Sequence, residues 1–321
     1  MTKCSRSILP LLICLAGPMA ASCSLFDRFT EKSAADIDRE NGRVRLALVA
    51  AGDPDSLAAA ALMGGSSGDG TESMRLLMAA VDAAPGRRDL AWLLLQKCLL
   101  DPQCDVRPAQ AHLQSIDAGN GAAWAGSLLR AGQAKDETGV ATALTAISQS
   151  QRFDIHWNSS VVHLAHALDR VPATRPSENA IAAIGIMAAI AIPQYAQFGS
   201  SCTVAALAKE GALETCRGLS NVLRKGDAII TESIGLRIAG RVWPKESPEY
   251  RDAMQDRRRL DYQLQWKNER AGEVVRAEYP IGLLERLSKF HSEQEAMAAE
   301  LVEAGIDPAP PPGWIGPTRR E

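Results

Sequence analysis

The sequence predicts an all-α protein, in which a stacked helix-turn-helix array is followed by a second helical bundle. Alanine and leucine, which favour helices, are abundant, whereas aromatic residues make up 5% of the 321 residues and β-branched runs are few. Apolar residues also recur at helical spacing in several segments. Finally, Trp92, Trp124 and Trp157 follow one another at intervals of 32 and 33 residues, and each comes after an apolar helix end and a turn. Together these features favour paired helices over strands.

The first half of the chain divides into alternating helices and turns. A Gly-Asp-Pro-Asp turn at 52–55 opens the first helix of the array. Pro108 is expected in the first turn of its helix, where proline is tolerated, and a later helix is expected to begin near Thr138. The expected helices cover residues 57–63, 76–81, the stretch around Trp92, 108–113, the stretch around Trp124, 140–147 and the stretch around Trp157.

Helix–turn–helix units of 34 residues are typical of tetratricopeptide repeats, and residues 52–171 resemble such an array in their tryptophan spacing. The resemblance implies that each helix pair buries its apolar face against the next pair and that the stack presents a concave surface to a peptide or a partner helix. An irregular helical domain whose tryptophans are spaced by chance is the alternative.

The second half, residues 172–305, is expected to be a separate α-helical domain. Prolines at 172–176 mark the boundary, and the next segment, 181–192, is apolar on every side, which predicts a fully buried helix. Helices are further expected at 229–242, from 257 to 270, and as one helix from 281 to 304. The arginines at 257–259 lie among acidic residues, so we expect an ion-paired, solvated face. The Pro-rich tail at 306–321 is expected to be extended and mobile.

The amino terminus indicates export. Lys3 and Arg6 precede an apolar run at 8–16 and small residues, which is the layout of a signal peptide. Ala20-Ala21-Ser22-Cys23 resembles the bacterial lipobox, and this resemblance implies that residues 1–22 are removed and that Cys23 is acylated. Ser24 then implies an outer-membrane lipoprotein facing the periplasm, with residues 23–51 as tether and first helix. Cleavage without lipidation is the alternative.

Composition narrows the range of partners. The net charge is −3, and it becomes −5 once Lys3 and Arg6 are removed with the leader. This acidity argues against a nucleic-acid partner, which requires a basic surface. The expected partners are therefore the membrane, through the lipid anchor, and a protein or peptide.

The four cysteines beyond Cys23 form two pairs that are close in sequence. Outside the cytoplasm an even number of cysteines favours disulfides, and we expect Cys98–Cys104 and Cys202–Cys216. Proximity is the only basis for this pairing. A zinc site made of the same thiols is the alternative, although neither pair has the spacing that zinc ligands favour. No cofactor is expected.

The histidines offer weak candidates for chemistry. His163 and His166 lie one helical turn apart and could share a metal or act in acid–base catalysis, whereas His156 is about 10 Å from His163 along the helix axis. Ser66 lies in a formal G-x-S-x-G match, but an alanine-rich helix precedes it, so we expect a loop rather than a nucleophile.

These features predict a membrane-tethered, extracytoplasmic helical scaffold that binds a protein or peptide and is not an enzyme. A periplasmic hydrolase that uses the helix of His163 and His166 is one alternative. An immunity-type lipoprotein that blocks a toxin is another, and the sequence does not separate it from the scaffold.

Overall fold

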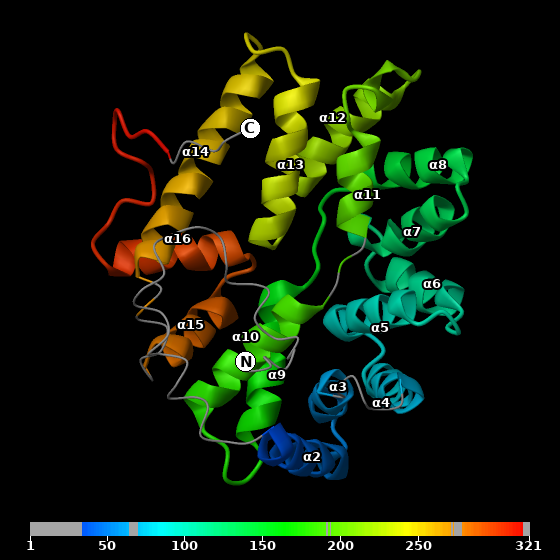
Figure 1. Ribbon diagram of the computed structural model, residues 1–321, viewed down its shortest axis with the longest axis vertical. Coiled ribbons are helices and arrows are strands. Elements are labelled where there is room, and N and C mark those ends of the chain that lie inside the picture. Colours follow the sequence, from blue (N-terminus) through cyan, green and yellow to red (C-terminus); the bar gives the residue numbers. More distant parts are fainter. Residues whose placement is uncertain are drawn as a thin grey trace, which may run out of the picture. The chain divides into compact units, whose positions relative to one another are not determined.

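The computed structural model describes residues 34–63, 70–190, 192, 194–270, 272 and 278–316. Within these residues the chain forms α-helices and short 3₁₀ turns, and the only β-type contact there is an isolated bridge between Asn120 and Arg152 (Figure 1). The all-α prediction is confirmed.

Contacts divide the chain into two units, Met1–Arg43 and Val44–Glu321. The described part of the first unit is the beginning of α2 (Ala34–Ala51), which carries arginine–carboxylate pairs one turn apart. The later helices all belong to the second unit.

Four consecutive helix pairs, each packed against its partner, cover residues 54–189. They are α3 (Pro54–Leu62) with α4 (Gly70–Ala83), α5 (Arg88–Leu100) with α6 (Val106–Ile116), α7 (Ala125–Gln133) with α8 (Glu137–Ser148), and α9 (Trp157–Asp169) with α10 (Pro176–Ala189). The side chains of Asp53, Asp105 and Asp136 cap α3, α6 and α8 by accepting a backbone N–H bond from the first turn. The cap of α8 is thus two residues before Thr138.

The three evenly spaced tryptophans occupy different places in these pairs. Trp92 lies inside α5 and is 1% exposed. Trp124 ends the 3₁₀ turn η2 (Gly121–Trp124), and Trp157 is the first residue of α9; both are half-buried. The pairs also do not stack only in chain order, because α9 packs on α3 as well as on α10. Helix-turn-helix pairs are therefore present, and their origin as a repeat stays a prediction.

Helices on both sides of residue 172, where we expected a domain boundary, share one apolar core. The helix α15 (Glu278–Lys289) packs on both α9 and α10, and Leu164, Ala183 and Leu284 belong to the same cluster of buried residues. The prolines at 172–176 mark a turn between packed helices, since Pro176 starts α10 in its first turn. Segments 52–171 and 172–305 therefore do not have separate cores.

The prediction that the apolar segment at 181–192 is a fully buried helix is wrong. In α10 the buried residues are Asn179, Ala180, Ala183 and Met187, whereas Ile181 is 42% exposed. The helix packs on α9 and α15 through one face, and alanines and a glycine fill much of the rest, so its composition overstated its burial.

The remaining helices are α11 (Gln194–Ser201), the 3₁₀ turn η3 (Ala206–Ala208), α12 (Ala212–Leu223), α13 (Ile229–Val242), α14 (Pro248–Glu269) and α16 (Glu293–Glu303). The expected single helix from 281 to 304 is wrong, because it breaks into α15 and α16. Ser292 and Glu295 form a capping box that starts α16, and such a box satisfies N–H groups that a continuous helix would bond internally.

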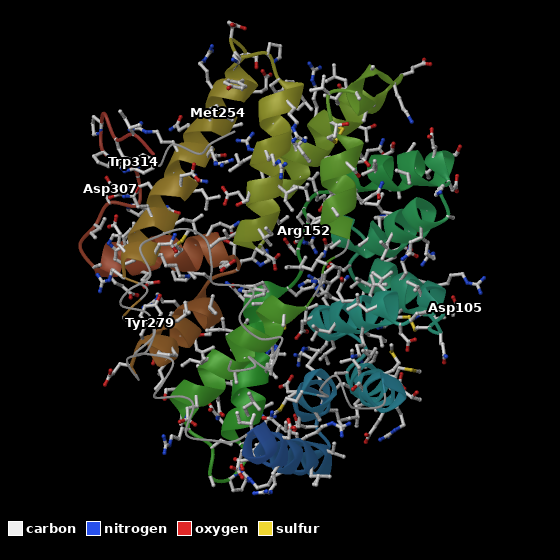
Figure 2. All side chains as sticks on the ribbon, viewed as in Figure 1. Asp105, Arg152, Met254, Tyr279, Asp307 and Trp314 are labelled. Atoms are coloured by element: carbon white, nitrogen blue, oxygen red, sulfur yellow. A yellow bond between two sulfur atoms is a disulfide. The ribbon has the colours of Figure 1, made fainter. Side chains whose placement is uncertain are left out.

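Residues 306–316 of the tail, which we expected to be mobile, lie against α14 (Figure 2). Arg258 and Gln263 of α14 donate hydrogen bonds to main-chain oxygens of the tail. Trp314 packs edge-on against Tyr262, with the ring centroids 5.4 Å apart. Proline residues have a carbonyl acceptor but no N–H donor. The Pro-rich segment is therefore held along α14 by side chains of the helix that donate to its carbonyl oxygens.

Candidate functional site

The expected acylation site, Cys23, lies outside the described residues, as do the signal sequence and Ser66. In the part of the chain that the structure describes, no helix combines the length and the apolar character needed to cross a membrane.

Both cysteine pairs form disulfides in the structure. Cys98–Cys104 closes the turn between α5 and α6, with its Cα atoms 5.3 Å apart. Cys202–Cys216 ties the end of α11 to α12, with its Cα atoms 5.9 Å apart. Because all four sulfurs are used in this way, the alternative zinc site has no free thiol.

His163 and His166, one turn apart on α9, have different surroundings. His166 is exposed, whereas Nδ1 of His163 lies 3.0 Å from a carboxylate oxygen of Asp89 and 2.7 Å from Nη2 of Arg87. No group of three histidine, cysteine or carboxylate side chains among the described residues could hold a metal ion.

Three histidines, two of them close in sequence and the third far from both, line one cleft of about 240 Å³, which we call the histidine cleft. His156 precedes the first residue of α9, His163 lies further along that helix, and His291 lies between α15 and α16. The other lining residues are Asn158, Ser159, Val162, Asp227, Leu287, Ser288 and Phe290.

Each of the three histidines lies against a different buried aspartate. His156 Nε2 is 3.2 Å from Asp117, His163 Nδ1 is 3.0 Å from Asp89, and His291 Nε2 is 3.3 Å from Asp154. These aspartate side chains are at most 7% exposed. A carboxylate that accepts one ring N–H orients the imidazole and leaves its other nitrogen as an acceptor while the ring is neutral.

The segment at 152–157 reaches this position because buried side chains hold it from two sides. Asn120, fully buried, accepts from the N–H of Asp154 and donates to its carbonyl oxygen. The carboxylate of Asp227 accepts from the N–H groups of Ile155 and Trp157. Between them His156 has φ +55°, in the left-handed region that costs a non-glycine residue about 1 kcal/mol or more. The hydrogen bonds of the residues on either side thus hold His156 in a strained backbone conformation directly before the first residue of α9.

Asp227 also joins the starts of two other helices. Its main-chain oxygen accepts from the N–H of Glu293 in α16, and the carboxylate of Glu293 accepts from the N–H of Ile229 in α13. The first turns of α9, α13 and α16 therefore meet at two acidic residues. Helix amino termini favour negative charge, which explains carboxylates at this point.

Burial and nearby charges shift the pKa values of these aspartates in opposite directions. Loss of water, followed by repulsion from Asp154, raises the pKa of Asp227 to about 6, although backbone N–H bonds favour its charged form. Burial also opposes charge on Asp89 and Asp117. For Asp89, hydrogen bonds from Arg87 and His163 outweigh it; for Asp117, those from His156 and Asn120 do, so both pKa values lie below the usual range.

The cleft is rich in acceptors. Asn158 is 3% exposed, its amide nitrogen donates to the carbonyl oxygen of Phe290, and its Oδ1 has no hydrogen-bond partner among the described residues. Four buried carboxylates surround the cleft, and in the described part of the chain only three arginines pair with them. The carboxylates are those of Asp89, Asp117, Asp154 and Asp227, and the arginines are Arg87, Arg88 and Arg152. This arrangement suits a positively charged group that donates hydrogen bonds.

Catalysis by a histidine-activated nucleophile has less support from the contacts. Among the hydrogen bonds of the described residues, none joins a histidine ring to a serine, threonine or cysteine side chain. A nucleophile activated by a base lies within hydrogen-bond reach of that base, although this contact is often looser before substrate binds.

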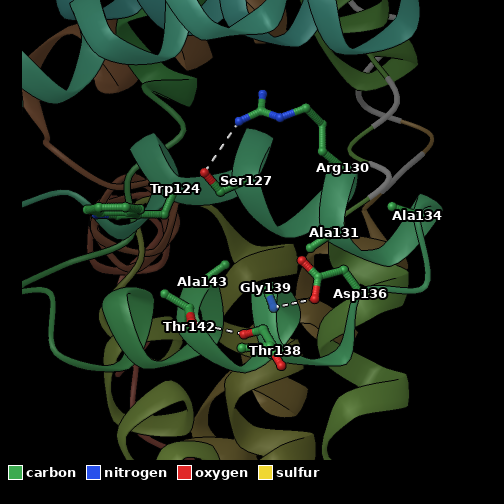
Figure 3. Close-up of a pocket in the computed structure, with 10 residues that line it drawn as sticks. All are labelled: Trp124, Ser127, Arg130, Ala131, Ala134, Asp136, Thr138, Gly139, Thr142 and Ala143. Carbon is green, nitrogen blue, oxygen red and sulfur yellow. Dashed lines mark hydrogen bonds between the residues drawn. The ribbon is translucent and has the colours of Figure 1, made fainter.

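Two other hollows lie along α7 and α8. One, of about 510 Å³, lies between Trp124, α7 and the start of α8 (Figure 3). There Arg130 reaches toward Ser127 rather than Asp136 (Figure 3), and burial lowers the pKa of its guanidinium. The other, of about 830 Å³, runs between α8 and α12 and includes Cys216 in its wall. The first hollow has fewer titratable groups than the histidine cleft, and the four in the second, Lys135, Glu137, Lys209 and Glu210, are all exposed.

Sequence reasoning found His156 and His163 but missed His291, Asp117 and Asp227. His156 and His291 are separated by 135 positions in the chain, and no motif or periodicity links them. His166, which was paired with His163 on helical spacing alone, lies outside the cleft lining.

No family model matches this chain, and no curated protein or solved structure proves similar to it. The case for a function therefore depends on the chain's own residues, and among the described residues the histidine cleft is where buried charges, a strained residue and an unpartnered acceptor coincide.

Proposed function

We propose that this chain is a membrane-tethered, extracytoplasmic helical module that binds a protein or peptide, and that its histidine cleft holds a basic side chain of that partner. The observation that carries the proposal is the set of three histidines in one cleft, each against its own buried aspartate. The buried aspartates surround the cleft with negative charge, and Oδ1 of Asn158 offers an unpartnered acceptor to a guanidinium or ammonium group.

The apolar part of the cleft supports the same ligand. Val162, Leu287 and Phe290 lie beside the polar groups. Lysine and arginine bury their aliphatic stems along apolar surface and present the charge at the tip. An aromatic ring near a cation adds about 0.5–1 kcal/mol at an exposed site.

Calorimetry on the full-length protein, with a chelator present, tests this proposal with N-acetylarginine amide and its neutral citrulline analogue. We expect the arginine compound alone to bind, because the acceptors favour positive charge. His156→Asn keeps a residue that tolerates the left-handed conformation, and Asn158→Ala removes the unpartnered acceptor; each should weaken binding about fivefold or more, which corresponds to about 1 kcal/mol.

His166→Asn is the matched control, since this histidine is on the same helix but outside the cleft lining. It should bind like the parent. Equal binding of arginine and citrulline compounds, or equal losses in His156→Asn and His166→Asn, would contradict a cation site in the cleft.

The tether is tested separately. We expect the mature protein from bacterial envelopes to begin at an acylated Cys23, since Ala20-Ala21-Ser22-Cys23 resembles a lipobox. Mass spectrometry of the amino-terminal peptide checks this, and Cys23→Ala should release the protein from the outer membrane. An unmodified Met1 on the mature chain would refute the tether and would leave the proposed cleft unaffected.

One observation favours a hydrolase as the second candidate. The Asp89 carboxylate lies against His163 as an orienting acid does in many general-base pairs. If this pair is catalytic, His163→Ala abolishes turnover of ester or amide substrates while His166→Ala does not. Full activity in His163→Ala removes this candidate.

A further inference from the structure

The docked tail and α14 enclose a second site, separate from the histidine cleft. A groove of about 500 Å³ lies between them, and its lining includes Arg251, Met254 and Arg258 of α14 together with Ala309 and Pro310 of the tail. We call it the tail groove.

The tail forms a defined wall of this groove. Arg258 donates from Nη2 to the carbonyl oxygen of Pro311 at 2.8 Å and from Nε to that of Trp314 at 3.2 Å. Gln263 donates to the carbonyl oxygen of Pro308 at 3.1 Å. These three hydrogen bonds and the Trp314–Tyr262 contact hold the segment along α14. Figure 2 shows Asp307 and Trp314 of this segment beside the helix.

Two of the three arginines that line the groove have no carboxylate partner among the described residues. Asp256 pairs with Arg224 and Arg259, and Arg259 also pairs with Glu232. Among the described residues, neither Arg251 nor Arg258 forms an ion pair with a carboxylate. Arg251 donates to the main-chain oxygen of Glu246, and Arg258 donates only to the tail carbonyls.

The spacing of these two arginines defines a ligand length. Residues 251 and 258 are two turns apart on α14, which is about 10 Å along the axis. A peptide in the polyproline II conformation has three residues per turn and rises about 3.1 Å per residue, so carboxylates three residues apart lie on one face of it and span a similar distance, about 9 Å. Met254, between the two arginines in sequence, and Pro310 of the tail also line the groove, and they provide apolar contact for the residues between the carboxylates.

We propose that the tail groove binds an acidic segment of a partner protein in the polyproline II conformation, with carboxylates three residues apart that pair with Arg251 and Arg258. Arginine recognises carboxylates through paired, charge-assisted hydrogen bonds. Two separated cations in a groove favour a peptide over a membrane or nucleic acid, each of which requires a broader basic surface. The proposal does not depend on what the histidine cleft binds.

Fluorescence anisotropy on the full-length protein tests it, with a labelled hexapeptide that has glutamates at its second and fifth positions. A peptide with glutamines there is the neutral control. We expect only the acidic peptide to bind, and Arg251→Gln to weaken binding about fivefold or more. Because Arg251 makes no contact with the tail in the described hydrogen bonds, this variant leaves the groove wall in place.

Two further variants make the outcome decisive. Arg237→Gln removes an exposed arginine of α13 and should bind like the parent, whereas Trp314→Ala keeps both groove arginines but weakens the wall, and should lower affinity. Equal losses in Arg251→Gln and Arg237→Gln, or equal binding of both peptides, would overturn the proposal. So would Arg251-dependent binding to anionic phosphatidylglycerol vesicles without peptide binding, since the surface would then be a membrane contact.

Discussion

Asp227 makes the stability of the protein depend on pH. In the folded chain its pKa is about 6, against an ordinary value of 3.8. The folded state therefore binds the proton of this carboxyl group more tightly than the unfolded state does. The resulting contribution to the free energy of unfolding is fully present below about pH 4 and is lost as pH rises through 6. The two-unit difference amounts to roughly 3 kcal/mol in total, of which about 2 kcal/mol falls between about pH 4.5 and 7.5.

Other shifted groups do not reverse this trend within that window. Burial also raises the pKa values of Glu232 and Glu293, which act in the same direction. The lowered pKa values of Asp89 and Asp117 contribute stability that is lost only as pH falls below their ordinary value of 3.8.

The assay is urea unfolding of the parent and Asp227→Asn at about pH 4.5 and 7.5. Asparagine can accept only one of the two backbone N–H bonds, so the variant should be less stable at both pH values. Its loss of stability between the two pH values should nevertheless be smaller than the parent's by about 2 kcal/mol. Asp82→Asn, at an exposed position of α4, is the control and should keep the parent's pH dependence. An identical pH dependence in Asp227→Asn would refute the reasoning.

Three further predictions concern packing and cross-links. Removing the Cys98–Cys104 disulfide by a double serine substitution should lower the unfolding free energy by about 2 kcal/mol in the chain-entropy model. An unfolding free energy that stays within about 0.3 kcal/mol of the parent's in urea titration would contradict this prediction. Gly235→Ala places a Cβ 2.6 Å from the main-chain nitrogen of Arg224, so it should destabilise by about 1–3 kcal/mol. Gly240→Ala, on the same helix with its nearest neighbour 4.0 Å away, should stabilise by up to about 1 kcal/mol, and thermal melts of the two variants should move in opposite directions. Phe153→Ala, at a fully buried ring packed edge-on against Phe198, should cost about 3–5 kcal/mol in chemical denaturation.

The sequence predicted helices well where local periodicity decides them. The stripe at 229–242 coincides with α13, and the spacing at 140–147 lies within α8. It failed at α15 and α16, which were expected as one helix, because α15 ends at Lys289 and the capping box of Ser292 and Glu295 starts a new helix. It also failed at α10, where apolar composition did not distinguish a helix buried on all sides from one that packs through a single face.

The histidine cleft was only partly predictable for a different reason. His156 and His163 are close in sequence, and their grouping was visible. Asp227 and His291 reach the cleft through the packing of α15 on α9 and through their own contacts with residues 154–157, which lie more than 60 positions away in the chain. Local patterns carry no information about such contacts.

Because Asp227 accepts the hydrogen bonds at the start of α9, the amino-terminal half of the chain alone cannot satisfy the backbone N–H groups of its last helix pair. The two N–H groups concerned receive their acceptor from a residue 70 to 72 positions further along the chain. A fragment that stops at residue 171 would leave them bare and would also lack α10 and α15 against its core. The start of α9 can therefore complete its hydrogen bonds only after residue 227 has been synthesised, and dissection of the chain into shorter pieces should yield poorly folded material.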